Sequence, residues 1–285
     1  MTILIIVESP SKCQKIEKFL GKGYKCIASF GHICQLTNIL VKNNFHPEFK
    51  LLKMKGKNIK NLSDSVKKAS EVILATDDDR EGEAIAWHIC RVTKLPIATT
   101  KRIIFHEITE KAIKQAVANP TIIDMKKVHA QLGRQVLDRL VGYTVSPTLW
   151  TSDKNNKLSA GRCQTPALRI VYDNQLEIDN EPGKRVFETT GYFLKNNLEF
   201  KLTKEFESEK KMDDFLEETV NYNHKITEVP KIKQTEKKAP NPLTTSLLQQ
   251  KASNELKFSP KLTMQVAQKL YEGGHITYMR TDNKR

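Results

Sequence analysis

Long apolar runs and paired cysteines are missing from this chain of 285 residues. No segment approaches the roughly 18 consecutive apolar residues that a membrane-spanning helix needs. The apolar stretch Ile3–Val7 has no basic region before it, unlike a secretory signal. Five cysteines occur without a C-x-x-C pair, which argues against a zinc ribbon and a disulfide framework. We therefore expect a soluble, intracellular protein with reduced thiols and no membrane contact.

Acidic residues are fewer than basic ones. The chain has 47 Lys plus Arg against 33 Asp plus Glu, a formal net charge of +14 and a pI of about 9.4. Basic surfaces of this kind attract polyanions, and they release counterions when they bind nucleic acid. The charge balance therefore indicates a polyanionic partner, although many basic proteins bind none in particular.

One segment reverses this charge balance. Residues Asp77–Glu83 hold five acids in seven positions, between the apolar run Val72–Ala75 and the helix-like run Ala84–Ile89. The acids thus occupy a strand-to-helix turn, and in an open α/β sheet such turns at the carboxyl ends of strands form the ligand crevice. Magnesium binds through one or two carboxylates and takes further ligands from phosphate oxygens. The cluster predicts a magnesium site, and the alternative is a solvated acidic turn that favours the helix N-terminus.

Strand and helix patterns alternate over residues 1 to about 120, which predicts a parallel sheet covered by helices. The later part of the chain reads as mainly helical, with a β-hairpin around Lys195-Asn196-Asn197 and a proline-rich linker at 230–242. We expect strands at 2–7, 25–30, 72–75, 102–105 and 225–229, helices at 12–20, 63–70, 110–117, 212–220, 244–256 and 260–272, and a polar, lysine-rich excursion at 42–60.

The segment His275–Asp282 predicts a short strand in which Tyr278 and Arg280 share a face. Tyrosine is one of the residues that form covalent intermediates, and a nearby guanidinium would favour its phenolate. A Tyr-x-Arg pair considered by itself is more often structural.

Several blocks, in their shared order, resemble those of the type IA DNA topoisomerases over essentially the whole chain. Ile6–Lys12 and Ala75–His88 resemble the two halves of that family's Toprim metal site, and Ile276–Asp282 resembles its active-site tyrosine block. Asp138–Tyr143 with Leu158–Gln164 resembles the family's DNA-binding helical region. Pro242–Gln250 resembles the start of its tyrosine-bearing domain.

The resemblance implies a multidomain α/β fold in four parts. A Toprim domain with a parallel-type sheet and flanking helices would span 1–120, with its excursion at about 36–60 packing on the next domain. A helical DNA-binding region at 121–184 and a β-containing arch segment at 185–238 would follow. The start of an incomplete helical tyrosine domain would occupy 239–285, so we expect a fragment.

The resemblance also implies the chemistry. Tyr278 would attack one strand of single-stranded or negatively supercoiled DNA, join its 5′ phosphate and later release it, without ATP or another nucleotide cofactor. Glu8 would be the general acid or base, and Lys12 and Arg280 would stabilise phosphate charge. Mg²⁺ would be the cofactor, with Asp77, Asp79, Glu8 and Glu81 as its ligands.

The DNA-binding residues implied by the resemblance are Arg134, Asp138, Arg162, Gln164 and His32. For Trp87 and Trp150 we expect core packing rather than base stacking. The protein would act as a monomer beside the DNA. Two alternatives stay open. The chain could belong to another Toprim enzyme, such as a primase or nuclease, in which Tyr278 would have no catalytic role. It could also be a DNA-binding remnant without catalytic activity.

Overall fold

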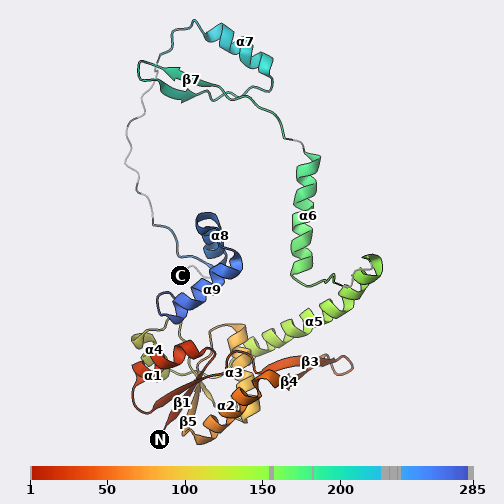
Figure 1. Cartoon of the computed structure of the whole chain (residues 1–285), viewed down its shortest axis with the longest axis vertical. Coiled ribbons are helices and arrows are strands. Elements are labelled where there is room, and N and C mark those ends of the chain that lie inside the picture. Colours follow the sequence, from red (N-terminus) through yellow and green to blue (C-terminus); the bar gives the residue numbers. More distant parts are fainter. Residues whose placement is uncertain are drawn as a thin grey trace. The chain divides into compact units, whose positions relative to one another are not determined.

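The computed structural model describes residues 2–153, 157–181, 183–225, 231, 236 and 239–281. The chain forms two compact units (Figure 1). The first consists of Met1–Arg162 and Pro240–Arg285, and the second of Cys163–Ala239. None of the helices in the described ranges is both long and apolar enough to cross a membrane.

A parallel sheet lies at the centre of the first unit. Its strands are β1 (Ile3–Val7), β2 (Tyr24–Ala28), β5 (Glu71–Leu74) and β6 (Lys101–Arg102), in the order β2-β1-β5-β6. β1 pairs in parallel with both β2 and β5, and its apolar residues are almost fully buried. The carboxyl ends of β1 and β5 therefore lie side by side, as the sequence predicts.

Helices cover both faces of this sheet. On one face, α1 (Cys13–Leu20) and α4 (Glu110–Ala118) contribute to a cluster that includes Ile5, Ile73 and Ile103. On the other face, α2 (Gly56–Lys68) and α3 (Arg80–Thr93) contribute to a second cluster. The α/β architecture of parallel sheet and flanking helices is confirmed.

The segment 42–60, predicted as a polar excursion without regular structure, contains a strand and the start of a helix. The antiparallel strands β3 (Cys34–Leu40) and β4 (His46–Leu51) form a hairpin of their own, and α2 starts at Gly56. Most hairpin side chains are half-buried or exposed, so the usual alternation of apolar and polar residues is weak. The 3-10 turns at Pro10–Lys12 and Lys53–Lys55 precede α1 and α2.

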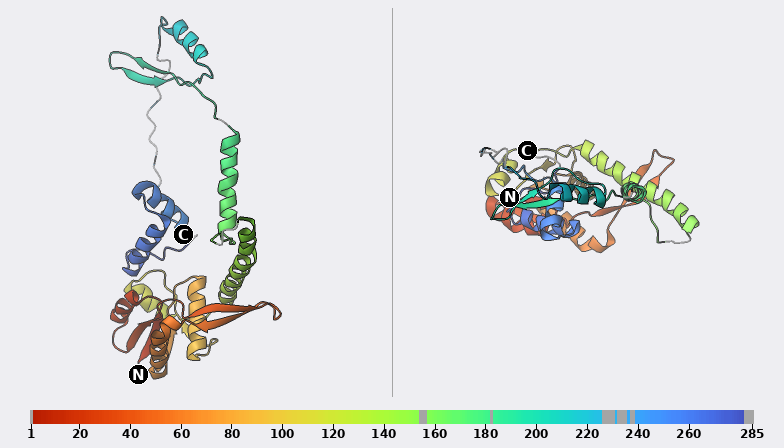
Figure 2. Two further views of the ribbon diagram at one scale, coloured as in Figure 1. Left: turned by 45° about the vertical axis from the view of Figure 1, so that its right-hand side comes forward. Right: turned by 90° about the horizontal axis from the view of Figure 1, so that it is seen from above.

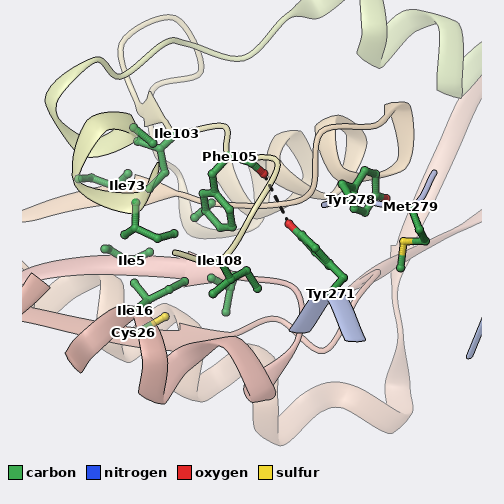
Figure 3. Close-up of a cluster of buried hydrophobic side chains, with 14 of the residues drawn as sticks. Ile5, Ile16, Cys26, Ile73, Ile103, Phe105, Ile108, Tyr271, Tyr278 and Met279 are labelled. Atoms are coloured by element: carbon green, nitrogen blue, oxygen red, sulfur yellow. Dashed lines mark hydrogen bonds between the residues drawn. The ribbon is translucent and has the colours of Figure 1, made fainter. Parts of the chain in front are cut away.

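Three further helices belong to the first unit: α5 (Met125–Asp153), α8 (Thr245–Leu256) and α9 (Pro260–Glu272). Ser259 caps α9 through a hydrogen bond from the backbone N of Leu262, as its position before Pro260 predicts. Tyr271 of α9 is 1% exposed and packs into the cluster under α1 (Figure 3). The C-terminal helices are thereby joined to the sheet.

The strand predicted at 275–282 is not formed. Tyr278 and Met279 lie in irregular backbone and are buried in the same cluster as Tyr271. The Tyr278 backbone N donates a 2.7 Å hydrogen bond to the carbonyl of His106, so the segment bonds to a loop rather than to a strand. Its apolar side chains are covered by the sheet domain.

The second unit contains α6 (Gln164–Asn180), β7 (Thr190–Phe193), β8 (Leu198–Lys201) and α7 (Glu209–Thr219). β7 and β8 form the predicted hairpin, and α7 lies beside it in both views of Figure 2. Phe206 and Phe215 contact each other at 5.2 Å between ring centroids. Residues 226–229 of the predicted strand at 225–229 and most of the predicted linker fall outside the described residues. The domain boundaries at 120, 184 and 238 stay predictions.

Candidate active site

Glu8 and Asp77 meet where β1 and β5 end. Glu8 directly follows β1, and its Oε1 accepts a 2.9 Å hydrogen bond from the backbone N of Asp77. Gly82 makes this approach possible, because a Cβ at Gly82 would lie 2.2 Å from the Asp77 carbonyl oxygen and 2.9 Å from Glu8 Oε1. The acidic loop, residues 76–79, is therefore packed directly against Glu8 and the first turn of α3.

Asp79 is the N-cap of α3. Its Oδ1 accepts a 2.7 Å hydrogen bond from the backbone N of Gly82, which satisfies one of the free donors at the helix start. Its Oδ2 accepts a 2.5 Å hydrogen bond from the phenol of Tyr278. One carboxylate thus both starts the helix and binds the candidate nucleophile.

Asp78 points away from its two neighbours. Its Oδ1 lies 2.9 Å from Lys127 Nζ on α5, and its Oδ2 lies 3.8 Å from His106 Nε2. The carboxylate thereby ties the acidic loop to the helical region. Asp78 therefore helps to hold the acidic loop in place, and its carboxylate does not lie beside Glu8.

Lys12 is fully buried beneath the acidic loop. Its ammonium pairs with Asp77 Oδ1 and lies 4.8 Å from the centre of the Tyr271 ring. A buried ammonium needs such partners, since an isolated charge away from water is costly. The ion pair brings a positive charge next to the carboxylates of the site.

Arg280 reaches the acidic loop from the C-terminal segment. Its Nη1 lies 3.4 Å from Asp79 Oδ2 and 3.3 Å from Glu81 Oε2. The predicted common face of Tyr278 and Arg280 is confirmed in this respect, because both side chains contact Asp79. Arg280 remains half-exposed, so the guanidinium can also reach a ligand.

The phenol of Tyr278 is held in its protonated form. Burial raises its pKa above the usual value, and the hydrogen bond and charge of Asp79 raise it further. Arg280 lowers the pKa, but its effect is smaller than these. The expectation that Arg280 favours the phenolate is therefore confirmed in direction, but burial and Asp79 outweigh it in this arrangement.

Glu8 has the protonation behaviour of a general acid or base. Burial and the negative charge of Asp77 raise its pKa to about 7. A carboxyl group with a pKa near neutrality can both give and take a proton at that pH. This property agrees with the role that the sequence predicts for Glu8.

Arg102 holds the acidic loop from below, and sequence reasoning missed it. Its guanidinium is fully buried, with NH1 donating to the carbonyl oxygen (3.0 Å) and hydroxyl (2.7 Å) of Thr76 and NH2 donating to the Asp77 carbonyl at 3.0 Å. Its Nε donates to Glu83 Oε2 at 2.8 Å, and Glu83 Oε1 accepts from the Asp124 backbone N at 2.7 Å. The available signal was an arginine that begins the apolar run Ile103–Phe105.

A cleft of about 800 Å³ opens beside these groups. Glu8 and His32 both line it, and His32 follows Gly31, whose φ is +80°. Burial lowers the pKa of His32. Lys261 and Lys269 of α9 also line it. A chain carrying phosphates would meet both the lysines and the carboxylates of the site in this cleft.

The predicted DNA-binding residues fall into two groups. Arg134 Nε lies 3.7 Å from Asp138 Oδ2, and Arg162 Nε lies 2.7 Å from Asp138 Oδ1, so one carboxylate orients both guanidinium groups. Gln164 starts α6 in the second unit. The predicted pairing of Arg134 with Asp138 is confirmed, and Arg162 is an additional partner.

The two tryptophans differ from each other. Trp87 packs against the core cluster on the α3 face, as expected. Trp150 is 37% exposed and donates a 2.6 Å hydrogen bond to the carbonyl of Leu158, so the expected core packing is wrong for it.

Two of the carboxylates predicted to bind a metal ion have protein partners in this structure. Within the described ranges, no group of three or more His, Cys, Asp or Glu side chains is arranged to hold a metal ion. The Asp77 carboxylate pairs with Lys12, and Asp79 contacts Tyr278 and Arg280. The donor set nevertheless fits Mg²⁺, which needs only one or two protein carboxylates beside water and phosphate.

Comparisons with known proteins agree with this geometry. A family described as DNA topoisomerase matches residues 122–285, and the Toprim domain family matches residues 3–108. The chain is 44% identical to DNA topoisomerase 1 of Thermotoga maritima over 295 residues, which cover 99% of this chain and 45% of that protein. It also superimposes on full-length topoisomerase I from Thermotoga maritima with a TM-score of 0.83 and 41% identity, covering 99% of this chain and 50% of that one.

A Toprim domain that gathers carboxylates beside a tyrosine defines a class of DNA-processing proteins. The chain belongs to the type IA DNA topoisomerases. It spans about half the length of the relatives that it matches.

Proposed function

We propose that this chain carries the strand-cleaving site of a magnesium-dependent, ATP-independent DNA topoisomerase that relaxes negative supercoils. The single observation that carries the proposal is the hydrogen bond between the Tyr278 phenol and Asp79 of the acidic loop. It places a phenol that can form a covalent link to phosphate beside carboxylates that can bind a divalent cation.

In the proposed reaction, the Tyr278 oxygen attacks the phosphorus of a DNA phosphodiester, and the bond from phosphorus to the 3′ oxygen breaks. The DNA strand is then joined to tyrosine through its 5′ phosphate, and the other strand end carries a free 3′ hydroxyl. After strand passage the hydroxyl attacks the same phosphorus and releases tyrosine. One phosphodiester bond replaces another at each step, so the cycle needs no ATP.

The surrounding side chains would move protons and balance charge. Glu8 would protonate the leaving 3′ oxygen and take the proton back during rejoining, which its raised pKa supports. Lys12 and Arg280 would stabilise the negative charge of the phosphate in the transition state. Asp79 would accept the phenol proton, since it already accepts that hydrogen bond.

Glu8, Asp77, Asp79 and Glu81 would hold Mg²⁺, with the ion and Arg280 competing for Asp79. When bound, Mg²⁺ supplies positive charge to phosphate oxygens. Arg134, Asp138, Arg162, Gln164 and His32 would bind single-stranded or negatively supercoiled DNA, and the protein would act as a monomer. The functional parts would be 1–120, 121–184, 185–238 and 239–285.

Covalent trapping tests the proposal. The chain is incubated with 5′-labelled and 3′-labelled single-stranded DNA and Mg²⁺, denatured, and separated by electrophoresis. We expect label on the protein only when it lies on the 3′ side of the break, and no adduct with Tyr278→Phe. Tyr271→Phe is the matched control, because Tyr271 lies in the same cluster and contacts the Tyr278 ring at 5.2 Å between centroids.

Two results would contradict the proposal. An adduct of undiminished yield in Tyr278→Phe would place the nucleophile elsewhere. Cleavage without any adduct would instead indicate a hydrolytic Toprim nuclease.

A further inference from the structure

One border of the cleft is a short loop at residues 29–32, which we call the His32 loop. It follows β2 directly, and its residues Gly31 and His32 line the cleft together with Glu8. The backbone N of Gly31 donates a 3.2 Å hydrogen bond to the Glu8 carbonyl, so the loop is attached to the residue that ends β1. The conformation of this loop therefore decides where the His32 imidazole lies relative to Glu8.

The backbone of the His32 loop has an unusual conformation. Phe30 and Gly31 are both left-handed, with φ of +59° and +80°. Glycine adopts such angles readily, whereas a residue with a bulky side chain rarely does. Phe30 is also 50% exposed, so burial of its ring contributes little to holding the loop. The conformation therefore needs support from another part of the chain.

Lys55 supplies this support from the 3-10 turn that precedes α2. Its ammonium donates hydrogen bonds to the carbonyl oxygens of Phe30 and of His32, the second at 2.8 Å. These carbonyls belong to the residues on either side of the loop glycine, and they converge on one positive charge. Hydrogen bonds from a charged donor are stronger than those between neutral groups. Two of the three N–H groups of the ammonium are thus used by the loop.

We propose that Lys55 is a positioning residue of the site, which holds the His32 loop in its left-handed conformation and so places His32 in the cleft for a DNA strand. The 3-10 turn is itself fixed against the end of the loop, because the backbone N of Leu52 donates a 3.0 Å hydrogen bond to the Ile33 carbonyl. Lys55 acts on DNA only through His32. This role rests on the proposed function, in which His32 binds DNA, whereas the hold on the loop does not.

A double-mutant cycle tests the role of Lys55. The affinity of the whole chain for a fluorescent single-stranded oligonucleotide is measured by anisotropy, without Mg²⁺. We expect His32→Ala to weaken binding, and Lys55→Met to weaken it by about tenfold, the equivalent of one hydrogen bond to a charged group. The double variant should bind no more weakly than the weaker of the two single variants, because both changes remove the same contact.

Lys53→Met is the matched control. Lys53 is exposed and lies in the same 3-10 turn, so its loss removes an equal charge without touching the loop carbonyls. Its affinity for the oligonucleotide should stay close to that of the wild type. Equal losses in Lys53→Met and Lys55→Met would refute the proposal, since both lysines would then only attract DNA by their charge. Additive losses in the double variant would also refute it, because a lysine that contacts phosphate directly acts independently of His32.

Hydrogen–deuterium exchange tests the hold on the loop without DNA. The Gly31 amide should exchange faster in Lys55→Met than in the wild type, and at the wild-type rate in Lys53→Met. Gly31→Ala is a second variant that disturbs the loop from within. Its Cβ would meet nothing within 4 Å, but its φ of +80° disfavours alanine. It should weaken DNA binding as Lys55→Met does, and a Gly31→Ala chain with wild-type affinity would contradict the importance of the loop conformation.

The two measurements separate this inference from the proposed function. An unchanged exchange rate of the Gly31 amide in Lys55→Met would refute the hold of Lys55 on the loop and leave the proposed function intact. Wild-type affinity of His32→Ala, together with faster exchange in Lys55→Met, would count against the proposed DNA contact of His32 and leave the hold on the loop intact.

Discussion

Tyr278 and Asp79 are 199 positions apart in the sequence, yet the phenol of one donates a 2.5 Å hydrogen bond to the carboxylate of the other. The same carboxylate caps α3 and contacts Arg280. In this arrangement burial, together with the hydrogen bond and charge of Asp79, raises the pKa of the Tyr278 phenol. Asp79 therefore joins the start of α3 to both side chains of the Tyr-x-Arg pair.

Removal of the two central carboxylates should separate DNA binding from chemistry. In a full-length enzyme, we expect Asp77→Asn with Asp79→Asn to retain DNA binding and to lose magnesium-stimulated relaxation, because the amides cannot supply negative charge to the ion. Gel-shift titration and a relaxation assay over a range of Mg²⁺ measure the two properties. Unchanged relaxation would show that these acids take no part in the reaction.

Gly82→Ala should disturb the acidic loop. The new Cβ would lie 2.2 Å from the Asp77 carbonyl oxygen and 2.9 Å from Glu8 Oε1. Overpacking of this kind costs about 1 to 3 kcal/mol in unfolding free energy. Urea unfolding measures the change. Gly133→Ala on α5 is the control, since its Cβ would meet nothing within 4 Å and alanine favours a helix by about 1 kcal/mol.

Arg102→Met should be strongly destabilising, because it leaves the Glu83 carboxylate buried without its partner. Loss of one member of a buried ion pair costs about 3 to 5 kcal/mol. Lys101→Met removes a surface pair from the neighbouring position of β6, where such pairs contribute about 0 to 1 kcal/mol. Thermal and urea unfolding compare the two. Equal effects would mean that Arg102 does not support the loop.

His88 should make stability depend on pH. Burial lowers its pKa from 6.5 to about 4, and its ring packs 4.7 Å from that of Phe49. Between these values the unfolded chain binds a proton that the folded chain does not, so stability is complete above pH 6.5 and falls towards pH 4. The loss is on the order of 3 kcal/mol. His88→Leu should flatten this slope in urea titrations, whereas the exposed His46→Gln should not.

Local signals in the sequence predict most of the architecture. The bounds of α8 and α9, the cap at Ser259 and the parallel order of β1 and β5 follow from apolar spacing and capping residues. The β3–β4 hairpin was missed because its strands are not strongly buried on either face. Without a buried face, the order of apolar and polar side chains does not reveal a strand.

The site was predictable as a set of residues but not as a set of contacts. The motif positions point to Glu8, Asp77 and Tyr278, and the structure brings them to one region. The bond from Tyr278 to the His106 carbonyl replaces the predicted strand, and the buried Arg102 is unmarked by any motif. Both depend on contacts between distant segments, which composition and periodicity do not encode.

The orientation of Asp78 links the acidic loop to α5. Its carboxylate forms an ion pair with Lys127 of α5. Asp77 and Asp79 are the neighbours of Asp78 in the chain, so this ion pair joins α5 to the segment that holds them. Asp78 therefore connects α5 to the loop whose next residue, Asp79, binds Tyr278.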